Sequence, residues 1–134
     1  MNSEEARKLL DIAKKALKNA YAPYSNLRVG AALLTKQGKI FTGVNIENAS
    51  YGLTICAERV AIFKAVSEGY RDFLAIAITS DRGKIVPCGA CRQVMAEFSK
   101  DLKVILGDEN VLEIHTLSEL LPESFNGSFL SSDN

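Results

Sequence analysis

The three cysteines of this 134-residue chain lie in two short motifs, Cys56-Ala57-Glu58 and Pro87-Cys88-Gly89-Ala90-Cys91. Three thiolates make an incomplete tetrahedral shell for zinc, and an incomplete shell is what a catalytic zinc needs to hold a reactive water. Glu58 lies two residues after the first cysteine, where a carboxylate can serve as general acid and base. The motifs therefore indicate hydrolytic chemistry at one zinc ion per chain, with the three cysteines as its ligands.

Two other interpretations of the cysteines stay open. His115, the single histidine of the chain, could complete a closed four-ligand zinc site that is structural and not catalytic. The thiols could also be metal-free residues of the core, because cysteine is common in protein interiors. A disulfide scheme is disfavoured, since an odd number of cysteines leaves one unpaired, and a reducing cytoplasm would keep all three free for metal.

Charge and hydropathy narrow the range of partners. The chain carries 16 lysines and arginines against 16 aspartates and glutamates, so its formal net charge is zero. A nucleic-acid-binding protein would normally show a basic stripe, so we expect no nucleic-acid partner and a small neutral molecule as substrate. Residues 1–5 are polar and acidic, and no apolar run approaches the ~18 residues of a membrane span. We expect a cytoplasmic protein with no membrane association.

Hydrophobic periodicity predicts the elements that must position the two motifs. Helices are expected over residues 4–20, 58–68, 89–98 and 117–121, and strands over residues 29–34, 40–44, 73–79, 104–106 and 111–114. This order predicts an α/β fold, a three-layer α/β/α sandwich around a five-stranded mixed sheet. The length predicts one domain, residues 1–134, small enough that a deep active site can need a neighbouring subunit to close it.

Both cysteine motifs fall where a helix is expected to begin. Positions three apart on a helix lie about 60° apart around its axis, so Cys88 and Cys91 can present both thiols to one ion. Cys56 and Glu58 are two apart, which would place them on roughly opposite sides of a regular helix. We therefore expect Cys56 at the non-helical cap, with its thiol and the Glu58 carboxylate facing the same space.

The charge of an all-cysteine site needs an offset. Three thiolates around Zn²⁺ sum to a net charge of about −1, which makes the metal a poorer Lewis acid. Two helix N-termini can offset that charge through their partial positive ends and unpaired N–H groups. Arg59 can add a full positive charge by bonding to a cysteine sulfur, and we take it as a residue that tunes the metal. Its alternative is an ordinary solvent-facing helix residue.

The segments Cys56-Ala57-Glu58-Arg59 and Pro87-Cys88-Gly89-Ala90-Cys91-Arg92-Gln93 closely resemble the zinc signature of the cytidine deaminases, in which C/H-x-E is paired with P-C-x-x-C. The resemblance runs from about Tyr21 to Phe125 and is to the small homotetrameric class with three cysteine ligands. It implies a cytidine deaminase-like fold, one Zn²⁺ per chain, and a homotetramer whose subunits share their active sites.

The resemblance also implies residues that hold the substrate. Within Gly43-Val44-Asn45-Ile46-Glu47-Asn48-Ala49, the positions that match Asn45 and Glu47 contact the ribose in the family. An amide and a carboxylate two apart on an extended segment point the same way, so together they can grip a diol. Without the resemblance, a turn former and a solvated loop carboxylate would be the simpler interpretations of these two residues.

Four further substrate positions follow from the resemblance. Tyr51 matches a tyrosine that reaches a neighbouring subunit's active site near the sugar 5′ end, with simple interface packing as the alternative. Phe125 matches a C-terminal aromatic that stacks near the pyrimidine, with a core position as the alternative. Ala57 is taken as a further substrate contact. At Leu27 the family usually has a phenylalanine, so one apolar wall of the base pocket is expected to be aliphatic.

The reaction implied by the resemblance is hydrolytic deamination of cytidine and 2′-deoxycytidine to uridine and 2′-deoxyuridine with release of ammonia, in pyrimidine salvage. Glu58 would take a proton from the water, protonate the ring at N3 and later deliver a proton to the departing amine. A blasticidin S deaminase is the alternative enzyme, and Asn45-x-Glu47 favours an ordinary ribose over it. A non-catalytic zinc module is disfavoured by the presence of Glu58, and editing of RNA or DNA bases by the zero net charge.

Overall fold

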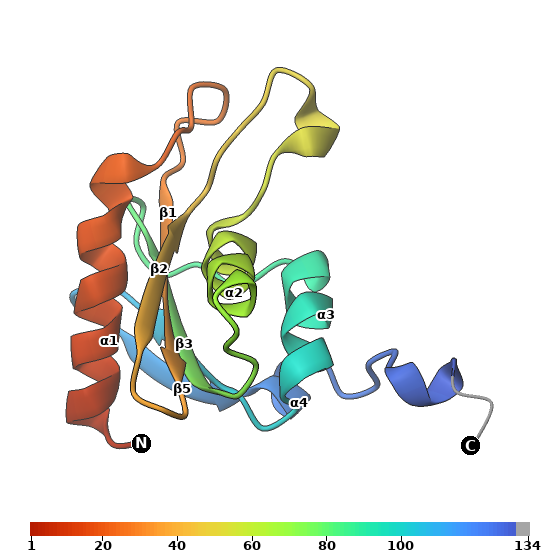
Figure 1. Cartoon of the computed structure of the whole chain (residues 1–134). Coiled ribbons are helices and arrows are strands. Elements are labelled where there is room, and N and C mark those ends of the chain that lie inside the picture. Colours follow the sequence, from red (N-terminus) through yellow and green to blue (C-terminus); the bar gives the residue numbers. More distant parts are fainter. Residues whose placement is uncertain (131–134) are drawn as a thin grey trace.

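A five-stranded sheet forms the centre of the computed structural model (Figure 1). Its strands are β1 (Val29–Thr35), β2 (Ile40–Val44), β3 (Phe73–Ser80), β4 (Lys103–Gly107) and β5 (Leu112–Thr116). They are ordered β2-β1-β3-β4-β5; β3 and β4 are parallel, and the other neighbours are antiparallel. The predicted mixed sheet is confirmed. The structure describes residues 1–130, so residues 131–134 of the predicted domain lie outside the described part.

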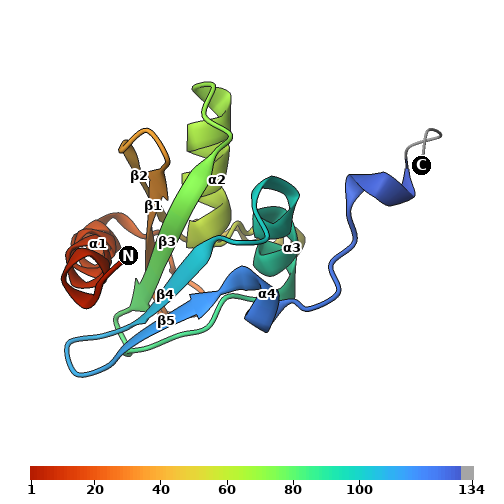
Figure 2. The same cartoon turned by 90° about the horizontal axis from the view of Figure 1, so that it is seen from below.

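Helices cover both faces of this sheet. The helix α1 (Ser3–Ala16) lies on one face, and α2 (Ala57–Ser67) and α3 (Gly89–Phe98) lie on the other. Figure 2 shows the same separation from below. A short helix, α4 (Leu117–Leu120), follows β5, and 3₁₀ helices span Leu17–Asn19, Tyr51–Leu53 and Gly127–Phe129. The arrangement confirms the predicted three-layer sandwich. In the part of the chain that is described, no helix has the length and apolar character to cross a membrane.

The first helix is shorter than predicted. It begins after Asn2, whose side chain accepts a hydrogen bond from the backbone of Glu5 in a capping box. Its regular α-helical part ends at residue 16 and one 3₁₀ turn follows, whereas the sequence predicted a helix to residue 20. The chain leaves the helix because Tyr21 pairs with an extended segment. Its N–H donates to the oxygen of Asn45 (3.0 Å), and its oxygen accepts from the N–H of Glu47 (2.8 Å).

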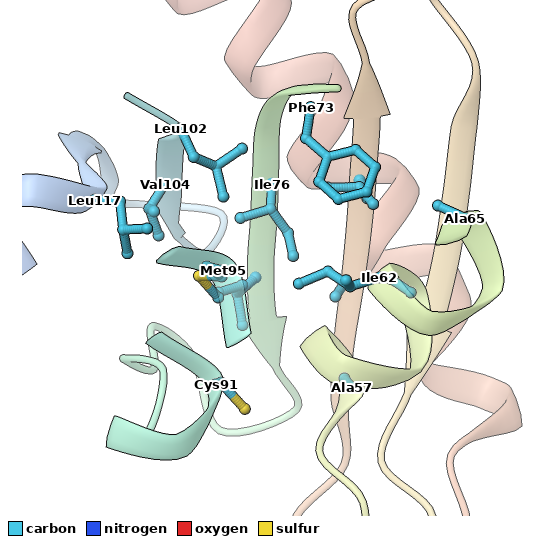
Figure 3. Packing of buried hydrophobic residues seen from close by; sticks show 14 of the residues in the cluster. Ala57, Ile62, Ala65, Phe73, Ile76, Cys91, Met95, Leu102, Val104 and Leu117 are labelled. Carbon is cyan, nitrogen blue, oxygen red and sulfur yellow. The ribbon is translucent and has the colours of Figure 1, made fainter. Parts of the chain in front are cut away.

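The larger hydrophobic core lies between the sheet and the helices α2 and α3 (Figure 3). Ile76 of β3 packs there with Ile62 of α2 and Met95 of α3, and all three side chains are fully buried. Burial of one such side chain contributes about 1.5–3 kcal/mol, so this layer fixes both helices on the sheet. A smaller core packs α1 on the opposite face. Because Cys91 belongs to the larger core, that core also fixes the start of α3.

The strand β2 and the helix α2 approach each other closely at Gly43. A Cβ atom built on this glycine would lie 2.3 Å from the backbone oxygen of Ala57 and 2.5 Å from the backbone nitrogen of Ala61. Both are backbone atoms of α2, so neither can rotate away as a flexible side chain can. Gly43 therefore sets the distance between β2 and the first turn of α2, which carries Glu58.

We predict that Gly43→Ala lowers the free energy of unfolding by about 3 kcal/mol or more, at the upper end of the range for overpacked interiors. Urea denaturation of the purified protein measures this change. Gly52→Ala is the matched control, because a Cβ atom at that position meets nothing within 4 Å. The control should alter stability by less than about 0.5 kcal/mol. Equal unfolding free energies for the two variants would contradict the prediction.

Candidate active site

The two cysteine motifs lie at the N-termini of α2 and α3, as the spacing predicted. Cys56 is the N-cap of α2 with extended backbone angles (φ −73°, ψ 153°), and Cys88 is the N-cap of α3 (φ −69°, ψ 166°). Cys91 follows in the first turn of α3, where its N–H donates to the Cys88 sulfur (3.4 Å). The N-termini of α2 and α3 therefore bring all three thiols together, and the partial positive charge of each helix N-terminus lies beside them.

The three sulfur atoms are spaced as zinc ligands. All lie within 4.8 Å of one another, with 3.9 Å between Cys56 and Cys88 and 3.4 Å between Cys88 and Cys91. Thiolates bound tetrahedrally at about 2.3 Å from zinc lie about 3.8 Å apart, so this donor set fits Zn²⁺. Three protein ligands leave the fourth position for water or substrate, which is the coordination of a catalytic and not a structural zinc site.

His115 does not belong to this cluster. The cluster that the described residues form contains the three cysteines alone. His115 lies on the edge strand β5, where its Nε2 is 2.9 Å from the Glu113 carboxylate and its Nδ1 is 3.5 Å from that of Glu119. The alternative in which this histidine completes a closed four-ligand site is therefore wrong.

Arg59 contacts the cluster from α2. Its Nη2 donates to the Cys56 sulfur at 3.3 Å. The pKa of the Cys56 thiol is lowered to about 5, first by a hydrogen bond with the Cys91 thiol and then by the Arg59 guanidinium. The pKa of Cys91 is raised instead, because its thiol bonds to Cys56 and is withdrawn from water. A bound Zn²⁺ deprotonates its ligand thiols, so the arginine then faces thiolate sulfur.

Glu58 lies beside the cysteines with its side chain almost fully buried. It is 4% exposed, and burial is the main cause that raises the pKa of its carboxyl group to about 7. The negative charge of the Cys56 thiolate adds to this rise. A carboxyl group whose pKa is near neutral can both take up and release a proton at physiological pH, as a general acid and base must.

A cavity of about 210 Å³ opens in front of these groups. It contains Glu58, two of the cysteines and three of the positions that the resemblance assigned to the substrate, namely Leu27, Asn45 and Ala57. Five other residues also line it, and the sequence reasoning missed them: Val29, Thr54, Ile55, Ile85 and Val86. Four of these five directly precede a cysteine motif: Thr54 and Ile55 come before Cys56, and Ile85 and Val86 come before Pro87. Their position next to the motifs was the sequence signal that could have identified them as cavity residues.

Asn45 has a structural role in the wall of this cavity. Its side chain is buried, with Oδ1 accepting from the N–H of Val29 (2.9 Å) and Nδ2 donating to the oxygen of Leu27 (2.7 Å). A primary amide has two N–H donors, so one remains for another partner. Asn45 therefore fixes the start of β1 and the backbone of Leu27 while it faces the cavity.

Glu47 and Tyr51 line a neighbouring groove of about 400 Å³, together with Tyr24, Ser25 and Thr54. Thr54 lines the cavity as well, so the two hollows share one wall. The Glu47 carboxylate accepts hydrogen bonds from the hydroxyl and N–H of Ser25 and from the N–H of Tyr24. These bonds, that of the hydroxyl first, lower the pKa of Glu47 below its ordinary value. The groove therefore carries a fixed negative charge at neutral pH.

Phe125 does not reach the cavity of its own chain. It is 56% exposed, lies outside both sets of lining residues, and stacks on Phe129 with ring centroids 5.4 Å apart. The Gln93 side chain donates to its backbone oxygen (2.7 Å). The C-terminal segment leaves the body of the molecule beyond α4, as Figure 1 and Figure 2 both show. Of the predicted substrate residues, Glu47, Tyr51 and Phe125 are thus absent from the cavity that contains Glu58, and the first two line the groove beside it.

Fold and site together define a hydrolytic zinc centre, built from two helix N-termini on a layered α/β domain. The sequence model of a protein family, the cytidine and deoxycytidylate deaminase zinc-binding region, matches residues 3–107, which is more than half of the chain. The chain therefore belongs to the cytidine and deoxycytidylate deaminase family.

Individual relatives agree with this assignment. A cytidine deaminase from Halalkalibacterium halodurans is 57% identical over 120 residues, which cover 87% of this chain and 91% of the relative. The crystal structure of a cytidine deaminase from Burkholderia pseudomallei has a TM-score of 0.85 and 49% identity, covering 93% of this chain and 100% of that one. A blasticidin-S deaminase from Bacillus cereus is less similar, with 33% identity over 129 residues, 90% of this chain and 91% of the relative.

Proposed function

We propose that the protein is a cytidine deaminase, which hydrolyses cytidine and 2′-deoxycytidine to uridine and 2′-deoxyuridine and releases ammonia. The observation that carries this proposal is a buried glutamate, with a pKa near 7, in one cavity with a three-thiolate zinc site. Displacement of an amine by water needs an activated water and a group that moves protons between water, ring and leaving amine. This cavity supplies both requirements.

Glu58 is the residue that moves protons. The zinc held by Cys56, Cys88 and Cys91 supplies Lewis acidity and lowers the pKa of a water molecule when it is bound. Glu58 then takes one proton from the attacking water and places it on N3 of the ring. After the water oxygen has bonded to C4, Glu58 takes the second proton from that hydroxyl and delivers it to the amine, which leaves as ammonia. Burial supports this role, because it removes the preference of the carboxyl group for its charged form.

Arg59 tunes the charge of the metal site. Three thiolates leave a zinc ion with a net charge of about −1, which weakens it as a Lewis acid. The Arg59 guanidinium, 3.3 Å from the Cys56 sulfur, withdraws negative charge from one ligand. The two helix N-termini act in the same direction on the other ligands. The site thereby stays acidic enough to activate water without a histidine ligand.

The cavity takes the pyrimidine and the groove takes the sugar. Leu27, Ala57 and the free N–H of Asn45 contact the base and the adjoining side of the ribose, and Glu47 accepts hydrogen bonds from the ribose hydroxyls. In the described part of the chain, neither hollow is lined by a lysine or an arginine. A 5′-phosphate would meet the charged carboxylate of Glu47 without a cationic partner, so the substrate is a nucleoside and not a nucleotide.

The alternatives are less well supported. A blasticidin S deaminase would use the same zinc chemistry, yet the cytidine deaminase from Halalkalibacterium halodurans is 57% identical to this chain, against 33% for the blasticidin-S deaminase from Bacillus cereus. A polynucleotide substrate would need basic groups along the strand, and the described residues that line the two hollows include no lysine or arginine. A non-catalytic zinc module would not need a carboxyl group held at a pKa near 7 beside the metal.

The active unit is a homotetramer with shared sites. Tyr51 is 76% exposed and Phe125 is 56% exposed, and large aromatic side chains exposed to this degree are typical of interaction surfaces. Phe125 reaches a neighbouring subunit's base cavity, and Tyr51 reaches the sugar end of a neighbouring site. The enzyme works in the cytoplasm, where reduced thiols are available to zinc and free nucleosides are salvaged.

The first test is the substrate range. We expect purified zinc-loaded protein to deaminate cytidine and 2′-deoxycytidine, with activity toward dCMP at least about a hundredfold lower because of the unpartnered phosphate. The change in ultraviolet absorbance of the base on deamination measures each rate, with adenosine and blasticidin S as further substrates. No turnover of cytidine or deoxycytidine would refute the proposed function, and faster turnover of blasticidin S would favour that alternative.

The second test concerns Glu58. We expect Glu58→Gln to reduce kcat by about 10³-fold or more, because the amide cannot exchange protons with water and ring. Zinc content, measured by atomic absorption, should stay near one ion per chain, because Glu58 is not a ligand. Glu68→Gln, at the exposed end of the same helix, is the matched control and should retain full activity. Loss of zinc in the Glu58 variant would mean that the residue is structural.

The third test is complementation between subunits. Co-expressed Glu58→Gln and Phe125→Ala chains should form mixed tetramers with higher activity than either variant alone, because some sites combine an intact Glu58 with an intact Phe125 from another chain. The control pair is Glu58→Gln with Leu27→Ala, since both residues line one cavity of one chain and mixing cannot restore it. No recovery in the first pair, or equal recovery in both, would contradict shared sites. Light scattering should give the mass of four chains.

A further inference from the structure

The loop of residues 22–28 carries Leu27 into the wall of the cavity that contains Glu58. The backbone of this loop turns sharply, and Asn26 adopts a left-handed conformation with φ 57°. A residue other than glycine keeps this conformation where its surroundings hold it, and asparagine is among the residues that tolerate it best. The position of Leu27 therefore depends on the contacts that hold the loop.

One set of these contacts comes from the groove. Ser25 bonds to the Glu47 carboxylate through its hydroxyl and its N–H, and the Ser25 hydroxyl oxygen accepts from the N–H of Leu27 (3.0 Å). Asn45 holds the oxygen of Leu27 (2.7 Å). These residues belong to the substrate site already described.

A second set comes from the turn that follows β3, which the site does not otherwise use. Arg82 donates from Nη2 to the carbonyl oxygens of Ser25 (3.3 Å) and Asn26 (3.4 Å), the two residues that precede Leu27. Asp81 pairs with Arg28 on the other side of Leu27. Its N–H donates to the oxygen of Arg28 (3.0 Å), and its carboxylate accepts from the N–H of Arg28 (3.2 Å). The turn thus holds the backbone on both sides of the cavity wall.

The turn is itself preorganised. The Ser80 hydroxyl donates to the oxygen of Gly83 (2.7 Å) and accepts from the N–H of Arg82 (3.1 Å). Gly83 has φ 93°, a conformation that favours glycine and closes the turn tightly. Because Ser80 is the last residue of β3, the base of the Arg82 side chain is fixed by the central sheet. The Arg82 guanidinium can therefore hold the loop of residues 22–28 in a fixed place relative to the central sheet.

We propose that Arg82 is a positioning residue for the deamination reaction. It touches neither substrate nor metal, and it acts by holding the carbonyl groups before Leu27 so that this side chain stays against the pyrimidine. The inference rests on the proposed function, since it assigns the cavity to the base. A guanidinium suits the role because its donors have a fixed planar geometry, whereas a lysine ammonium is a compact point charge on a flexible stem.

The first measurement separates binding from chemistry. Arg82→Ala should raise KM for cytidine about three- to tenfold while kcat stays within about twofold, because a displaced wall weakens ground-state and transition-state binding alike. Arg82→Lys should recover only part of this loss. Arg71→Ala is the matched control, an exposed arginine that lines neither hollow, and its KM should equal that of the unmodified enzyme. A KM for Arg82→Ala equal to that of the control would overturn the proposal.

A double-mutant cycle tests whether Arg82 acts through Leu27. In the Leu27→Ala background there is no leucine side chain left to position, so Arg82→Ala should cause no further rise in KM. The same fold-rise in both backgrounds would show that Arg82 acts elsewhere and would overturn the proposal. Unchanged zinc content is expected in Arg82→Ala, because the arginine is exposed and does not belong to the cysteine cluster.

A readout without substrate keeps this inference separable from the proposed function. Backbone amides of residues 24–28 should exchange hydrogen faster in Arg82→Ala than in Arg71→Ala, because the loop has lost two of its hydrogen bonds. Equal exchange would refute the role of Arg82 even in an active enzyme. If the unmodified protein fails to deaminate cytidine while the exchange difference is present, the proposed function fails and the loop contact stands.

Discussion

The structure depends on one constraint, which is that three sulfur atoms from two helices must meet within the shell of a single ion. The cysteines of α2 and α3 lie 32 residues apart in sequence, with β3 between them. The hydrophobic core between these helices and the sheet holds both helix starts, and Cys91 is part of that core. The same helix starts also supply the positive backbone ends that three thiolates need. The two helix N-termini therefore both position the three sulfur atoms and offset their negative charge.

Within this arrangement, neighbouring residues of one helix start have their pKa values moved in opposite directions. Burial raises the pKa of Glu58 to about 7, while bonds from Cys91 and Arg59 lower the pKa of Cys56 to about 5. A ligand must be deprotonated to bind metal, whereas a proton carrier must exchange its proton near neutral pH. The different environments of two residues only two apart thus supply both behaviours. Arg59 contributes by facing the ligand sulfur.

The sequence predicts this centre well because its determinants are local. Helix starts, cap positions and the spacing of Cys88 and Cys91 depend on neighbours along the chain, and all are found where the spacing placed them. The surrounding walls are less predictable. Asn45 reaches Leu27 through a long-range side-chain bond, and the Arg82 contact depends on a left-handed residue in a separate loop. The periodicity of hydrophobic residues does not encode such long-range contacts. Phe125 is a further case, because it does not line the Glu58 cavity of the same chain.

The two parts of the site therefore differ in how easily they can change. The metal ligands lie on helices that are packed into the main core, where a substitution disturbs burial worth about 1.5–3 kcal/mol per side chain. Leu27 of the cavity wall lies instead on a loop that is held by a few hydrogen bonds, each worth about 0.5–1.5 kcal/mol. A change at Leu27 or in the bonds of its loop can reshape the cavity beside Glu58 without loss of zinc or of the fold. Substrate preference can thus diverge around a constant metal centre, which separates the chemistry of this domain from its specificity.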